Sequence, residues 1–222
     1  ENIYVYAIGS KNICDIYIME KIDQNIIEQK KYSKLKILKS ENSYIIDVNH
    51  LHDTLEELSC GHKSYIDQNG IKNLKKLRKL DCSDTDKIND VNYLCDTLEK
   101  LCCVQNSGIN QKGISELKKL RKLDCSNNDK INDVNHLCDI LEELDGGYHC
   151  GINQKGISKL NKLRKLYCHG NTKINDVNHI ANTLEELYCD NYSGIDQKGI
   201  SQLNKLKILN CYVNTKINDV NH

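Results

Sequence analysis

Cysteine and histidine are the residues in this chain that could make a metal site, a disulfide framework or a catalytic nucleophile. The 222 residues include 12 cysteines and 8 histidines. No C-x-x-C pair occurs, whereas zinc sites usually place paired ligands two to four residues apart. Neither His149 nor His169 has a serine or cysteine at the spacing of a known nucleophile motif. We therefore expect no catalytic residue, no metal, no cofactor, no small-molecule substrate and no enzyme activity.

Most of the cysteines recur at one place in a repeated phrase, which indicates packing. These are Cys60, Cys82, Cys103, Cys125, Cys168, Cys189 and Cys211. A free cysteine behaves as a small hydrophobe, so this series predicts a buried ladder of thiols, with metal binding and disulfides as the alternatives. Many reduced thiols favour a cytoplasmic location. Four histidines also recur at one position, where Tyr93 replaces a fifth, and this predicts a packing or turn contact: His50, His136, His179 and His222.

The elements that would position these side chains belong to a repeat of about 43 residues. The phrase LRKLDC at residues 77–82 returns at 120–125, and then as LRKLYC at 163–168 and LKILNC at 206–211. A second phrase, of the type LEELSC, lies between them, so the starts at residues 35, 55, 77, 98, 120, 141, 163, 184 and 206 are 20 to 22 residues apart. Such a period predicts a stack of similar coils.

The pattern L-x-x-L-x-C-x-x-N-x-x-I resembles that of the leucine-rich repeat family over residues 35–222. The resemblance implies an α/β fold: a right-handed β/α solenoid whose parallel strands form a sheet on the concave face. We expect about nine coils in residues 35–222, the last one truncated. Residues 1–34 are interpreted as a degenerate N-terminal repeat, with a further strand in residues 3–8. The chain starts at Glu1 and stops within the phrase INDVNH, so we expect it to be a piece of a longer protein.

Charged residues occupy the second and third positions of each predicted strand and change sign from coil to coil. Glu56 and Glu57 are followed by Arg78 and Lys79 one coil later. Parallel neighbours lie about 4.8 Å apart, so opposite charges would face each other along the sheet. The only mismatch that this pattern predicts is Lys100 facing Lys122. Because no basic stripe of one sign runs across the coils, and no apolar run is long enough to cross a bilayer, we expect neither a nucleic-acid nor a membrane partner.

Three series of repeated polar residues and glycines are predicted to hold the coils together. Asparagine after the strand would satisfy backbone groups in the turn: Asn106, Asn128, Asn171 and Asn214. Aspartate before V-N would cap a short helix: Asp47, Asp90, Asp133, Asp176 and Asp219. Glycine before isoleucine would allow close backbone packing: Gly70, Gly113, Gly156 and Gly199. Gly146 interrupts the cysteine series, and we expect Cys150 to fill the gap beside it.

If the positions that hold the same residue in every coil build the scaffold, the positions that vary between coils are the candidates for binding a partner. Side chains alternate across a strand, so the residue before each ladder cysteine should lie on the outer, concave face. In the C-terminal half this face would carry tyrosine and histidine bordered by aspartate, and tyrosine is frequent at binding hot spots. Neutral variation of a solvated face is the alternative. The candidate partner-binding residues are Asp124, Asp145, Tyr148, Tyr167, His169, Tyr188, Asp190 and Tyr212.

The wording GINQKGISELKKLRKLDC at residues 108–125 also resembles leucine-rich repeat proteins of giant DNA viruses that infect amoebae. This resemblance implies binding to a partner protein, with a host protein as the candidate and the host cytoplasm as the location. Some such proteins carry an F-box and act as substrate receptors of ubiquitin ligases; an F-box would have to lie upstream of Glu1. A structural or self-assembling solenoid is the other hypothesis.

Overall fold

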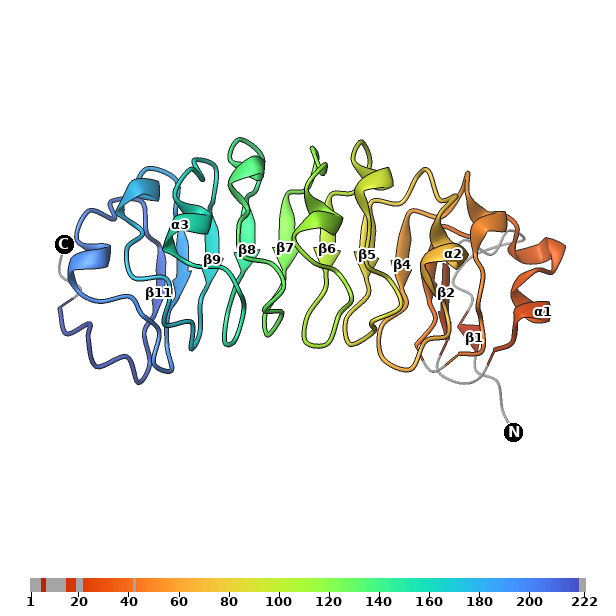
Figure 1. Cartoon of the computed structure of the whole chain (residues 1–222), viewed down its shortest axis with the longest axis horizontal. Helices are drawn as coiled ribbons and strands as arrows, with labels where there is room; N and C mark the ends of the chain where they lie inside the picture. The colour runs from red at the N-terminus through yellow and green to blue at the C-terminus, as the bar shows by residue number, and fades with distance from the viewer. Residues whose placement is uncertain (1–4, 7–14, 19–21, 42, 220–222) are drawn as a thin grey trace. The chain divides into compact units, whose positions relative to one another are not determined.

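A computed structural model of the chain describes residues 5–6, 15–18, 22–41 and 43–219. The chain forms two compact units, Glu1–Lys119 and Leu120–His222. Both units are built from the same coil, which is a short strand followed by a turn and a return segment (Figure 1).

Each strand is only a few residues long and falls on a repeated phrase. The first unit contains β1 (Val5–Tyr6), β2 (Asp15–Ile18), β3 (Ile37–Lys39), β4 (Glu57–Ser59), β5 (Lys79–Asp81) and β6 (Lys100–Cys102). The second unit contains β7 (Lys122–Asp124), β8 (Glu143–Asp145), β9 (Lys165–Tyr167), β10 (Glu186–Tyr188) and β11 (Ile208–Asn210). From β3 onward there is one strand for each of the nine predicted phrases, and β1 lies within the segment predicted as a further strand.

Neighbouring strands pair in parallel and in register, except that β1 runs antiparallel to β2. In the second unit the same register runs from β7 to β11, so equivalent residues of successive coils face each other. The predicted parallel-sheet solenoid is therefore confirmed. A side chain on one strand lies beside the residue at the same position of the next coil, which decides how a surface patch can form.

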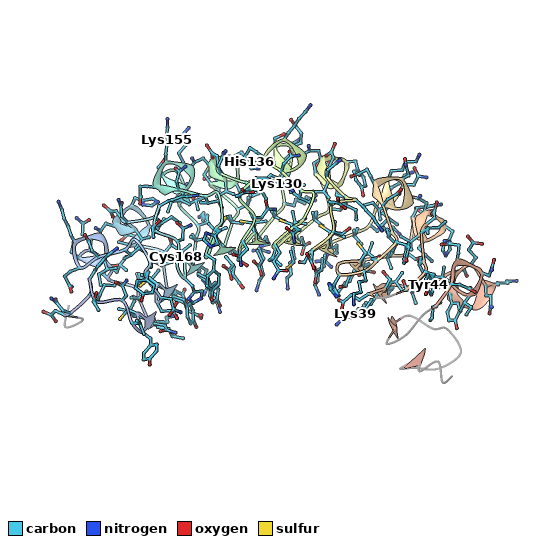
Figure 2. All side chains as sticks on the ribbon, turned by 60° about the horizontal axis from the view of Figure 1, so that its bottom comes forward. Lys39, Tyr44, Lys130, His136, Lys155 and Cys168 are labelled. Carbon is cyan, nitrogen blue, oxygen red and sulfur yellow. The ribbon has the colours of Figure 1, made fainter. Side chains whose placement is uncertain are left out.

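The core is a stack of leucine, isoleucine and cysteine. The central leucine of each strand from β3 to β10 is buried. The ladder cysteines after these strands are fully buried as well: Cys60, Cys82, Cys103, Cys125, Cys168 and Cys189 (Cys168 is labelled in Figure 2). Cys211, which follows the last described strand, is only half-buried. The Sγ atom of Cys150 would lie 3.9 Å from a Cβ added at Gly146, which confirms that Cys150 lies beside the gap in the ladder.

The return segments contain three single-turn α-helices and seven 3₁₀ helices among the described residues. They are α1 (Gln24–Ile27), α2 (Gln68–Ile71) and α3 (Gln154–Ile157), and the 3₁₀ turns Lys30–Tyr32, Asn49–Leu51, Asn92–Leu94, Lys112–Ile114, Asn135–Leu137, Asn178–Ile180 and Lys198–Ile200. The aspartate before V-N caps the 3₁₀ turn as predicted; Asp176, for example, accepts the Asn178 amide at 2.8 Å. A Cβ at Gly156 would lie 2.0 Å from the Asn132 carbonyl oxygen, which confirms the close backbone approach.

Two further polar ladders connect each coil to the next, and the sequence reasoning did not identify them. The side-chain amide of Gln154 donates through Nε2 to the backbone carbonyl of Asp176 at 2.8 Å. Its Oε1 atom accepts from the backbone amides of residues 175 and 176. The side chain of Asn178 similarly donates to the Lys198 carbonyl and accepts the Gln202 amide. The repeated histidine or tyrosine makes a third contact: Tyr93 and His179 each reach a backbone carbonyl of the preceding coil at 3.0 Å, as predicted.

The turn after the strand is one residue longer in alternate coils, and this overturns one prediction. Asn171 is buried and donates to two carbonyl oxygens, those of Gly146 at 2.6 Å and Ile152 at 3.1 Å, as expected of the turn asparagine. In the longer turns, however, the buried position comes one residue later and holds Ser64, Ser107, Cys150 or Ser193. Asn106 was therefore placed wrongly: it is exposed, and Ser107 beside it is buried.

The strand charges form the predicted ladder of ion pairs. In the second unit these are Arg121–Glu142, Lys122–Glu143, Arg164–Glu185, Lys165–Glu186 and Lys207–Glu185. In the first unit, Lys100 lies in register with Lys79, a like-charge contact that the sequence analysis did not count. Lys79 pairs with Glu57 on its other side.

Candidate functional site

The predicted site gathers six of its eight residues on the exposed face of the second unit. Tyr167 on β9 and Tyr188 on β10 are register neighbours, and their rings stack with centroids 4.5 Å apart and planes inclined by 12°. The His169 ring lies 6.0 Å from each of them. We call the set Asp145, Tyr148, Tyr167, His169, Tyr188 and Asp190 the tyrosine patch.

The His169 ring is held in place by a carboxylate from the next coil. Its Nδ1 atom makes a short hydrogen bond with Asp190 Oδ1, and both side chains are largely shielded from solvent. Fixing Nδ1 in this way fixes the orientation of the imidazole. The ring therefore forms a preorganised wall beside the two tyrosines.

Asp145 differs from the other aspartates in its row. Asp81 and Asp124 each accept two hydrogen bonds from the serine two residues later, one from its amide and one from its hydroxyl. Gly147 takes the place of this serine two residues after Asp145, so among the described residues the carboxylate accepts only the Gly147 amide, at 3.0 Å. Burial, and then the nearby Asp124 carboxylate, raise the pKa of Asp145 to about 6.

Tyr148 does not belong to the row of His169 and Asp190, which each lie one residue after the ladder position. Gly147 occupies the position equivalent to His169, and Tyr148 lies one residue later, in the left-handed backbone region at φ 53°. The equivalent residue of the next coil is Gly170, at φ 61°. The extra residue of the longer turn comes later, between Tyr148 and the buried Cys150. The Tyr148 ring nevertheless comes within 6.3 Å of His169 and stays half-exposed.

The other two predicted residues lie at the margins. Asp124 is the register neighbour of Asp145, and it accepts two hydrogen bonds from Ser126 in the turn after β7. The Tyr212 side chain is 76% exposed and makes no ring contact with the tyrosine patch within the described residues. The structure thus places Tyr212 at the same face without joining it to the cluster.

A second aromatic pair, which the sequence analysis missed, lies in the first unit. Tyr44 and Tyr65 are both about half-exposed, with ring centroids 5.5 Å apart, and the Lys87 ammonium lies 4.7 Å above the Tyr65 ring. Their spacing of one coil, directly after a buried serine, was the available signal. Lys87 already occupies one face of this pair.

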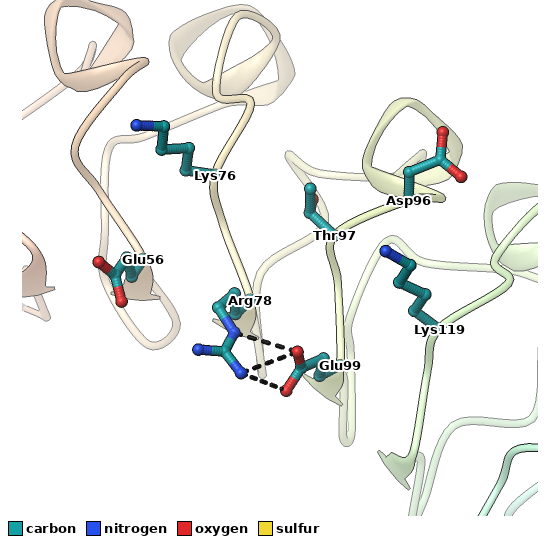
Figure 3. Close-up of a pocket in the computed structure, with 7 residues that line it drawn as sticks. All are labelled: Glu56, Lys76, Arg78, Asp96, Thr97, Glu99 and Lys119. Carbon is teal, nitrogen blue, oxygen red and sulfur yellow. Dashed lines mark hydrogen bonds and ion pairs between the residues drawn. The ribbon is translucent and has the colours of Figure 1, made fainter.

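A groove of about 370 Å³ in the first unit is lined almost entirely by charged side chains (Figure 3). In the wall of this groove the Arg78 guanidinium donates hydrogen bonds to both carboxylate oxygens of Glu99, at 2.9 to 3.0 Å. Its acidic and basic groups balance: Glu56, Asp96 and Glu99 against Lys76, Arg78 and Lys119. The groove therefore offers no field of one sign to an anionic or cationic ligand.

Two of the ladder thiols are poor nucleophiles. Burial raises the pKa of Cys82 and of Cys189 to about 12, so both stay protonated at neutral pH. Across residues 22–41 and 43–219 no group of three histidine, cysteine, aspartate or glutamate side chains could hold a metal ion. Within the same part of the chain, no helix is both long enough and apolar enough to span a bilayer.

The crystal structure of an internalin from Listeria monocytogenes matches 86% of the chain with a TM-score of 0.58 and 20% sequence identity. The fold is that of a leucine-rich repeat solenoid. The match spans 65% of the internalin chain, less than two thirds of it. No family model and no curated protein matches the sequence.

Proposed function

We propose that the chain is a non-enzymatic protein-binding module, and that the tyrosine patch on the sheet face, the concave side of such a solenoid, contacts the partner. The observation that carries the proposal is the stacked pair Tyr167 and Tyr188 on the exposed face. On β4, β5 and β6 the same strand position holds small or polar residues: Ser59, Asp81 and Cys102. Tyrosine offers a large contact area at a low cost in conformational entropy, and the stack lowers that cost further.

The rigidity of the surroundings supports this proposal. His169 is fixed by Asp190, and each strand carrying a tyrosine is held on both sides by in-register neighbours. A preorganised surface loses less entropy when it binds than a mobile one does.

Affinity capture from amoebal lysate, read by mass spectrometry, tests the proposal. The parent chain is compared with the double variant Tyr167→Ser, Tyr188→Ser and with the matched double variant Tyr44→Ser, Tyr65→Ser. We expect a protein that is retained by the parent and the second variant and lost by the first. Equal retention by all three would place the binding site elsewhere and contradict the proposal.

We further propose that the partner is a host protein in the cytoplasm and that the source is a giant virus of amoebae. The packing of ladder cysteines as thiols supports a reducing compartment. An F-box upstream of Glu1 would make the solenoid the substrate receptor of a ubiquitin ligase. Co-purification of ubiquitin-ligase subunits with the parent protein would support that version, and their absence would count against it.

A structural, self-assembling solenoid is the second candidate. The last described coil exposes 44% of Ile208 and 48% of Val213, apolar surface that an end-to-end contact would cover. Light scattering over a range of concentrations distinguishes the two functions. A mass that rises with concentration supports self-assembly, and a constant monomer mass excludes it.

A further inference from the structure

We infer that the tyrosine patch binds a basic segment of its partner, with an arginine side chain lying between the Asp145 carboxylate and the open face of the Tyr167 ring. This inference rests on the proposed function and specifies the chemistry of the partner. It combines the position of an acceptor with the geometry of an aromatic surface.

The first observation is that Asp145 has no cationic partner within the described residues, although its neighbours do. Glu143 on the same strand pairs with Lys122 at 2.6 Å, and Glu186 on β10 pairs with Lys165 at 2.8 Å. Asp190 makes its short hydrogen bond with His169. Asp145 accepts only the Gly147 amide, which leaves its second carboxylate oxygen for a ligand.

The second observation is the direction of the tyrosine stack. Tyr167 lies between Asp145 and Tyr188 in the register, and Tyr188 covers one face of its ring. Because β10 pairs with β9 on one side and β8 pairs with it on the other, the second face of the stacked Tyr167 ring lies on the β8 side, the side of Asp145. The face of an aromatic ring attracts a cation, so the ring and the carboxylate favour the same ligand charge.

Arginine fits this site better than lysine does. Its planar guanidinium can stack on a ring while its N–H groups donate to a carboxylate, whereas the lysine ammonium is a compact, strongly hydrated point charge. His169, which is 6.0 Å from Tyr167 and bound to Asp190, closes the side of the site. The Tyr44 and Tyr65 pair shows that a tyrosine ring of this chain can hold a cation, because the Lys87 ammonium lies over the Tyr65 ring.

The test is an NMR titration of the ¹⁵N-labelled chain at low salt with blocked pentapeptides Gly-Gly-X-Gly-Gly, where X is arginine, lysine or citrulline. Citrulline keeps the shape of arginine and removes its charge. We expect the arginine peptide to cause saturable shifts at the amides of Gly147 and Tyr167, with citrulline on the order of tenfold weaker and lysine in between.

Asp145→Asn is the decisive variant, because asparagine still offers an oxygen to the Gly147 amide. We expect it to weaken the arginine peptide on the order of tenfold. Asp81→Asn changes the same strand position where no tyrosine is present, and it should leave the titration unchanged. Equal affinity for arginine and citrulline, or for the parent and Asp145→Asn, would overturn the inference.

The outcome is independent of the capture experiment. A partner that needs Tyr167 and Tyr188, combined with no selectivity for arginine, would overturn the basic partner and leave the binding module. Arginine-selective shifts without any captured protein would support the site and count against the proposed protein partner.

Discussion

Replacing Asp145 by asparagine is expected to stabilise the folded protein at neutral pH. The folded state raises the pKa of this carboxyl from 3.8 to about 6, first through burial and then through the Asp124 carboxylate. The folded chain thus holds the proton more tightly than the unfolded chain. The stability that this group contributes is complete below pH 3.8 and is lost as the pH rises through about 6.

Such a pKa difference corresponds to about 3 kcal/mol of lost stability at pH 7 and about 0.5 kcal/mol at pH 4. Solvent screening at this half-buried position lowers the expected gain of Asp145→Asn at pH 7 to about 1–3 kcal/mol. Asparagine keeps the acceptor for the Gly147 amide, so the turn itself should persist.

Urea unfolding followed by circular dichroism measures this gain at pH 7 and at pH 4 for the parent and the variant. We expect the difference between the two proteins to be large at pH 7 and to shrink at pH 4. Asp81→Asn is the control and should change the stability by less than about 0.5 kcal/mol. A difference that is equal at both pH values, or a variant less stable than the parent at pH 7, would refute the electrostatic reasoning.

Four further substitutions test the scaffold by urea unfolding at pH 7. Leu144→Ala removes a fully buried side chain beside Gly146 and should cost about 2–5 kcal/mol; a near-unchanged midpoint would contradict the core assignment. Gly156→Ala should cost about 1–3 kcal/mol or more, because its Cβ would lie 2.0 Å from a carbonyl oxygen, and a neutral result would contradict the close approach. Lys100→Glu replaces a like-charge neighbour of Lys79 and should add about 0.2–1 kcal/mol, a gain that 1 M salt removes; a gain that persists in salt would point to another cause. Gln105→Gly should add about 1 kcal/mol, because residue 105 lies at φ 58° in the left-handed region, and a loss of stability would show that the Gln105 side chain has a packing role.

The sequence predicted the repeated scaffold well because each coil obeys the same rules. The inward leucine, the ladder cysteine and the close glycine recur at fixed spacing, so one phrase defines the environment of all its copies. Asp176 and His179 illustrate this, since the recurrence of each predicted a turn contact that the structure contains.

The candidate site was harder to predict because it depends on where the coils differ. Counting residues from the strand placed Asn106 one position away from the buried row, since the longer turn cannot be recognised from a single phrase. Tyr148 was grouped with His169, although it lies two residues after the ladder position and His169 only one. The stacking of Tyr167 on Tyr188 and the hold of Asp190 on His169 depend on side-chain rotamers, which the repeat pattern does not encode.

The central claim is that the exposed sheet face of the second unit contacts a partner protein, and site-specific photo-crosslinking tests it most directly. A photoreactive residue at position 210, the register neighbour of Tyr188, leaves the tyrosine patch intact, and the same residue at position 198 on the return segment is the control. We predict a covalent adduct with one partner protein from position 210 and none from position 198. An adduct that forms equally from both positions, or only from position 198, would contradict binding at the tyrosine patch.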